Sequence, residues 1–100
     1  MPLSLFHLGR YQEAERQFLY LKKKMPTEPL IYYWLSQVYE KLNRLNEAEE
    51  AIKKANDYSN KENIEYLNRW ARILKLLKKD EQANQISNLA LNISSGNIEK

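Results

Sequence analysis

The six residues GRYQEA at positions 9–14 decide the fold, because variants of this hexapeptide return twice along the chain. NRLNEA occupies positions 43–48 and KKDEQA occupies positions 78–83, so the pattern recurs after 34 and then 35 residues. A period of this length fits one pair of antiparallel α-helices with its turns. Each copy ends in a small residue that lets the second helix of a pair approach the first closely: Ala14, Ala48 and Ala83.

Apolar residues recur at helical spacing on both sides of these hexapeptides. Ile31, Leu35, Val38 and Leu42, for example, follow the three- and four-residue steps of one helix face. The chain has only two glycines and three prolines among 100 residues, too few for the many turns of an all-β protein. The sequence therefore predicts an all-α fold with helices near residues 2–8, 11–24, 28–42, 46–57, 61–78 and 80–93.

Residues suited to helix boundaries separate the apolar stripes. Gly9 suits the end of the first helix because glycine tolerates a left-handed backbone, and Pro29 suits a first helical turn, where a missing N–H does no harm. Polar residues that favour N-capping are expected at the starts of four helices: Thr27, Asn46, Ser59 and Asp80.

With these features the chain resembles the tetratricopeptide repeat family. The first unit matches at Gly9, Tyr11, Ala14, Phe18, Leu21 and Pro26. The middle unit matches at Tyr32, Leu35, Ser36, Tyr39, Leu45, Ala48, Ile52 and Ala55. The third matches at Leu67, Trp70, Ala71, Leu74, Ala83 and Ala90. The chain departs from the family pattern where the turn glycine becomes Asn43 and Lys78, the closing proline becomes Asn60 and Ser95, and Phe18 becomes Ser87.

The resemblance implies an α-solenoid of antiparallel helical hairpins in a right-handed superhelical stack, with about two and a half repeats. The predicted repeat domain covers residues 1–93, with units near 1–27, 28–61 and 62–95, and residues 94–100 form a polar tail. The first helix has only about two turns. Either the chain is a piece of a longer array, or a partner covers its N-terminal end.

The composition argues against catalysis and bound cofactors. There is no cysteine, and His7 is the only histidine, so the chain lacks the residues of a typical zinc site or of a nucleophile with its base. The glycines are too few and too far apart for a phosphate-binding loop. No apolar run reaches the length of a membrane span, and no secretory signal is evident, so a cytoplasmic protein that is not an enzyme is predicted.

The family binds partners on the concave side of the stack, which is lined by the first helix of each hairpin. Arg69, Arg72 and Lys75 are spaced by three residues and would form one basic stripe there. Basic residues beside aromatic rings suit an acidic peptide, because arginine can hold a carboxylate with two parallel hydrogen bonds. The predicted partner-binding residues are Tyr33, Trp34, Gln37, Lys41, Asn68, Arg69, Arg72 and Lys75. The alternative is that Trp34 packs between helices and the basic residues are only solvated.

The sequence therefore predicts a protein–protein interaction module, part or C-terminal end of a larger scaffold, that binds a protein or peptide in this groove. One alternative is a helical-repeat RNA-binding module, although a net charge of +3 makes nucleic acid a poor fit. Another is a structural cap or dimerisation element, including a homo-oligomer. An Arg72→Glu substitution is expected to weaken an acidic partner and leave stability nearly unchanged.

Overall fold

Six α-helices follow one another through the part of the chain that the computed structural model describes, which is residues 2–95, with side chains for residues 4–94. The predicted all-α fold is confirmed. The helices are α1 (Pro2–His7), α2 (Tyr11–Lys24), α3 (Pro29–Lys41), α4 (Leu45–Tyr58), α5 (Ile64–Leu76) and α6 (Asp80–Ser95).

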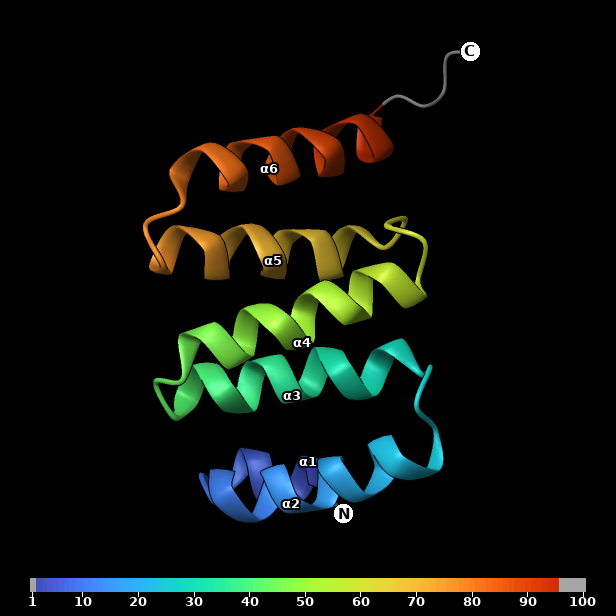
Figure 1. The fold of residues 1–100 in the computed structure, drawn as a ribbon, viewed down its shortest axis with the longest axis vertical. Coiled ribbons are helices and arrows are strands. Elements are labelled where there is room, and N and C mark those ends of the chain that lie inside the picture. Colours follow the sequence, from blue (N-terminus) through green and yellow to red (C-terminus); the bar gives the residue numbers. More distant parts are fainter. Residues whose placement is uncertain (1, 96–100) are drawn as a thin grey trace.

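The helices form one stack in which each packs against its neighbours in sequence (Figure 1). The helices α1 and α2 lie at one end of this stack and α6 lies at the other, and the longest dimension is 44 Å. The turns within the hairpins, α1–α2, α3–α4 and α5–α6, lie on one side, and the turns between hairpins lie on the other. Side chains at equivalent positions of successive repeats therefore recur along the same side of the stack.

The turn within each hairpin has the same backbone structure. Its central residue has a left-handed conformation in every repeat, with φ of 80° at Gly9, 62° at Asn43 and 63° at Lys78. Two backbone hydrogen bonds close the preceding helix around each of these residues, as in the Schellman motif. The common geometry shows that the three hexapeptides are structurally equivalent.

We expect Lys78→Gly to stabilise the fold, because a residue with a Cβ is strained in the left-handed region. The strain costs about 1–2 kcal/mol, and the extra chain entropy of glycine in the unfolded state cancels part of the gain, so the net gain is about 1 kcal/mol. The measurement is the free energy of unfolding in urea. Asn43→Gly should raise the free energy of unfolding by less, because asparagine tolerates the left-handed conformation better than lysine does. If Lys78→Ala stabilises the protein as much as Lys78→Gly, backbone strain is the wrong explanation.

Several helix starts differ from the predicted ones, because other side chains form the caps. Glu28, and not Thr27, caps α3 by accepting a hydrogen bond from the backbone N–H of Leu30 at 3.4 Å. Asn63 caps α5 in the same way, with its oxygen 3.0 Å from the nitrogen of Tyr66. Ser59 lies at the C-terminal end of α4 and donates to the carbonyl oxygen of Ala55.

Two further caps are corrected. The helix α4 begins at Leu45 without a side-chain cap, so Asn46 does not cap it. The helix α6 begins at Asp80, as predicted, so Asp80 is its first residue and not the residue before it. Residues 94 and 95, which the sequence placed in the polar tail, are helical. The rest of the predicted tail, residues 96–100, lies outside the described residues.

The core consists of two clusters that run through the stack. One joins α2, α3 and α4, and the other joins α3, α4, α5 and α6. The repeated alanines at positions 14, 48 and 83 are fully buried, in agreement with the close helix approach that their size predicts. Two polar side chains, Ser36 and Asn56, are also fully buried among the described residues. The amide of Asn56 donates to the carbonyl oxygens of Ile52 on α4 and Tyr66 on α5. This side chain therefore ties the second repeat to the third.

Candidate functional site

The first helices of the second and third repeats, α3 and α5, lie against each other along the predicted partner-binding surface. The Tyr33 ring is 4.8 Å from the Tyr66 ring, between centroids, and Arg69 on α5 donates to Gln37 on α3 at 3.1 Å. The structure thus brings most of the predicted residues to one surface. Whether a partner binds there stays a prediction.

A glutamate that the sequence analysis did not select lies at the centre of this surface. Glu40 on α3 accepts from Arg69 Nη1 and from Arg72 Nε, both at 2.9 Å, and its side chain is only 12% exposed. Glu40 lies one helical turn after Gln37, on the same face of α3, and this shared face was the signal that could have identified it. The basic stripe is therefore partly neutralised.

The two arginines have different environments. Arg69 is 22% exposed and directs its two terminal nitrogens at Glu40 and Gln37, so it holds α5 against α3. Arg72 is 62% exposed and uses only its Nε for Glu40. Within the described part of the chain, the terminal nitrogens of Arg72 have no recorded partner. Glu40 therefore orients the Arg72 guanidinium while leaving its outer edge open for a ligand.

The two aromatic residues assigned to the groove are packed, which agrees with the alternative stated for Trp34. Tyr33 is 8% exposed, and its hydroxyl donates to Glu65 at 3.2 Å. Burial, together with the charge of Glu65, raises the pKa of Tyr33. The half-buried Trp34 ring lies edge-on to the Phe6 ring of α1 at 5.3 Å. An RNA-binding module would stack bases on exposed rings, and the packing of these two rings argues against that use.

Two shallow hollows mark what remains open on this surface. One lies between α3 and α5 and is lined by Tyr33, Glu65, Asn68, Arg69 and Arg72. The other lies between α5 and α6 and is lined by Asn68, Ala71, Arg72, Lys75, Leu76 and Ser87. Asn68 and Arg72 border both hollows, which joins them into one surface along α5. Lys41 is exposed but borders neither of them.

This surface offers hydrogen bonding and positive charge. Asn68 can both donate to and accept from a peptide backbone, and Arg72 and Lys75 can donate to carboxylates. Among the described residues there is no group of three or more His, Cys, Asp or Glu placed to hold a metal ion. No helix in the described part of the chain is both long enough and apolar enough to cross a membrane.

Comparison with known proteins confirms the family resemblance for the middle of the chain. Residues 30–62 match the family model described as tetratricopeptide repeat. These residues contain nearly all of α3, the turn with its left-handed Asn43, and all of α4. A search of curated proteins found no match.

Two solved structures have the same fold. The chain is similar to "MamA RS-1 ArsTM double mutant" with a TM-score of 0.92, and to MamA from residue 41 to its end from Desulfovibrio magneticus RS-1 with a TM-score of 0.90. Sequence identity is 18% in both, and each match covers 99% of this chain but 55% of the solved chain. This chain therefore spans about half the length of those structures, and at this identity the likeness shows the fold alone.

Proposed function

We propose that this chain, in which residues 30–62 form a tetratricopeptide repeat, is a protein-interaction module that binds an acidic segment of a partner along α5. The observation that carries the proposal is the state of Arg72. Its Nε donates to Glu40, the residue lines both hollows of the surface, and its outer nitrogens have no recorded partner among the described residues. An oriented guanidinium loses less conformational entropy when it binds a carboxylate than a freely moving one does.

Neighbouring residues extend the same chemistry along the helix. Lys75 lies one turn after Arg72, is exposed, and makes no ion pair with any described residue. Asn68 lies one turn before Arg72, where its amide can bind the backbone of an extended peptide. Together they form a strip about two turns long that would hold the backbone and two acidic side chains of a short segment. Such a module would serve in a scaffold that gathers partners without chemistry of its own.

Selection from a displayed library of short random peptides tests this function, with the full chain as bait. We expect the enriched peptides to be rich in Asp and Glu, and the double substitution Arg72→Gln, Lys75→Gln to weaken their binding by about tenfold or more, since a hydrogen bond to a charged group contributes about 1.5–3 kcal/mol. Titration calorimetry of the enriched peptides measures the affinity.

Glutamine is a better replacement than glutamate because Arg72 lies beside Glu40. A glutamate at position 72 would place a second carboxylate beside Glu40, so that substitution would also disturb the α3–α5 contact. The matched control is Lys53→Gln, Lys54→Gln, which removes two exposed cations from α4, a helix that does not line this surface. Enrichment of neutral peptides, or peptide affinities that are the same for the double variant and the control, would rule out this surface.

A further inference from the structure

A cation at the turn of the second repeat reaches back to the first repeat. Arg44 follows the left-handed Asn43 and donates through Nε and Nη2 to Glu47 of its own repeat. Its remaining terminal nitrogen, Nη1, donates at 3.1 Å to Glu15 on α2 of the preceding repeat. The Arg44 guanidinium also lies over the Tyr39 ring, and burial together with Glu15 raises the pKa of that tyrosine to about 12.

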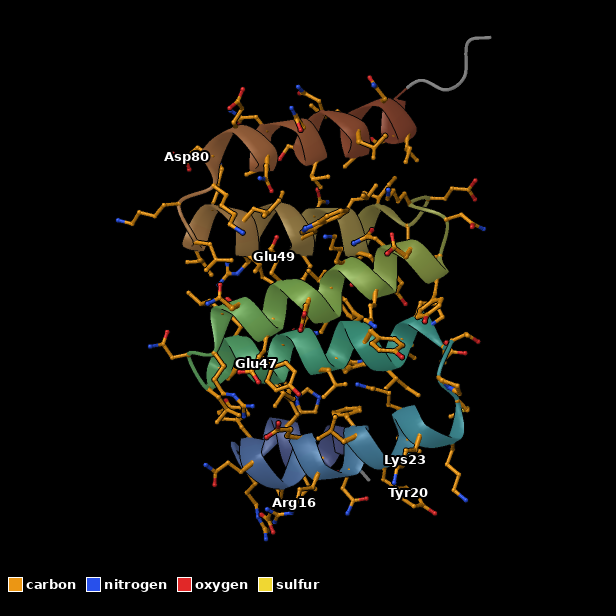
Figure 2. The ribbon with its side chains drawn as sticks, viewed as in Figure 1. Arg16, Tyr20, Lys23, Glu47, Glu49 and Asp80 are labelled. Carbon is orange, nitrogen blue, oxygen red and sulfur yellow. The ribbon has the colours of Figure 1, made fainter. Side chains whose placement is uncertain are left out.

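The third repeat makes the equivalent contact with different residues. Lys79 follows the left-handed Lys78 and donates at 2.9 Å to Glu49 on α4 of the second repeat. Glu15 and Glu49 hold the same position, immediately after the repeated alanine. Figure 2 shows Glu49 and the start of α6 at Asp80 on the same side of the stack, where the turns within the hairpins lie.

An apolar contact accompanies each of these ion pairs. Leu42, two residues before Arg44, packs against the cluster that contains Ala14 and Phe18 of α2. Leu77, two residues before Lys79, packs against the cluster that contains Ala48 and Ile52 of α4. In the second and third repeats, therefore, a cation that bonds to the preceding repeat follows, two residues later, a leucine that packs on the core cluster shared with that repeat.

The first repeat has the same two residues without their partners. Leu8, the equivalent of Leu42 and Leu77, is 69% exposed. Arg10 donates through Nε and Nη2 to Glu13, as Arg44 does to Glu47, but its Nη1 has no recorded partner in the described chain. Arg16 lines a hollow together with Arg10 and adds a second positive charge there.

We propose that Leu8 and Arg10 form a docking surface for a helix of another helical-repeat protein. The helices that dock on the equivalent residues within this chain specify the chemistry of that helix. α2 presents Ala14-Glu15 followed by Phe18, and α4 presents Ala48-Glu49 followed by Ile52. The docking helix therefore carries the sequence Ala-Glu-x-x followed by a large apolar residue. Its glutamate accepts a hydrogen bond from Arg10 Nη1, and its apolar side chain packs on Leu8. This surface lies apart from the strip along α5.

A second copy of the chain does not fit this description. The only helix that a head-to-tail neighbour would offer is α6, where the pattern reads Ala83-Asn84 followed by Ser87. Asn84 lacks the charge and Ser87 lacks the apolar surface. The docking helix is therefore not α6 of a second copy, and the missing pattern on α6 provides a way to test the surface.

The test supplies the pattern on a variant of the chain and measures its binding to the wild type by titration calorimetry. The donor carries Asn84→Glu and Ser87→Ile on α6, and Arg10→Gln so that it does not bind itself. The wild-type chain is the acceptor. We expect a one-to-one complex that weakens with added salt, and an Arg10→Gln acceptor that binds about five-fold more weakly, as expected for the loss of an exposed ion pair. A Leu8→Ser acceptor should also bind more weakly.

The controls separate this surface from others. A donor with only Arg10→Gln should not bind. Position 87 is half-buried, so Ser87→Ile could prevent folding. In that case a second donor, with Arg10→Gln and Asn84→Glu but the native Ser87, replaces the first. The proposal is overturned if neither donor binds, or if the wild-type and Arg10→Gln acceptors bind equally. It is also overturned if Arg72→Gln, Lys75→Gln in the acceptor removes binding, because the donor glutamate would then occupy the strip along α5.

Discussion

Asn56→Asp is expected to destabilise the protein by about 3–5 kcal/mol at pH 7, because it places a carboxylate where only an amide is tolerated. Asn56 is fully buried and donates to two carbonyl oxygens, one on α4 and one on α5. Its own oxygen has no hydrogen-bond partner among the described groups. An ionised carboxylate at this position would face two acceptors without a donor, in a site closed to water.

The loss of stability should depend on pH. Burial and the two carbonyl groups raise the pKa of the new carboxyl in the folded protein above the value of about 3.9 that it has in the unfolded chain. The folded state then binds the proton more tightly, so the loss of stability relative to the wild type is smallest below pH about 4. This loss grows as pH rises toward the folded pKa, at about 1.4 kcal/mol per pH unit.

Urea unfolding of the variant and the wild type at several pH values between about 4 and 8 measures this difference. Asn88→Asp is the matched control, because Asn88 is an exposed residue in the middle of α6 and the same substitution there should change stability by less than about 0.5 kcal/mol. A penalty that is the same at every pH would mean that the position admits water, and that Asn56 does not tie the repeats together through a dry contact.

The sequence predicted the helices well because their signal is local. Apolar spacing of three and four residues determines which face of a helix is buried, and the recurring hexapeptide located each turn within a hairpin to the residue. The caps were predicted less well. Thr27 and Glu28 compete for one cap, as do Ser59 and Asn63 for another, and the outcome depends on the path of the chain between helices.

The candidate site was only partly predictable because it depends on contacts between helices. Spacing placed Arg69 and Arg72 on one face of α5, but it did not show that Glu40, about 30 residues earlier, meets both. The same limit applies to Trp34. It lies off the apolar stripe of its own helix, and it is half-buried because α1 packs Phe6 against it.

Leu67→Ala is expected to destabilise the protein by about 2–5 kcal/mol, the usual cost of a cavity at a leucine that its neighbours do not refill. Leu67 is fully buried in the cluster that joins α3, α4, α5 and α6. The helices α4 and α6 flank α5 and both contribute to this cluster. Neither helix can move into the cavity left by the substitution without losing other packing contacts. Urea unfolding measures the loss. Leu76→Ala on the same helix is the control, because Leu76 is 44% exposed and its removal should cost less than about 1 kcal/mol.

The distribution of this loss along the stack is as informative as its size. In a linear array each repeat contacts only its neighbours, and the cluster that joins α2, α3 and α4 does not include Leu67. Leu67→Ala should therefore speed amide hydrogen exchange in α5 and α6 more than in α2, which contributes no residue to the cluster around Leu67. If exchange instead speeds equally in all of these helices, the stack unfolds as one cooperative unit, and the contacts between repeats, Asn56 among them, are strong compared with the stability of each repeat alone.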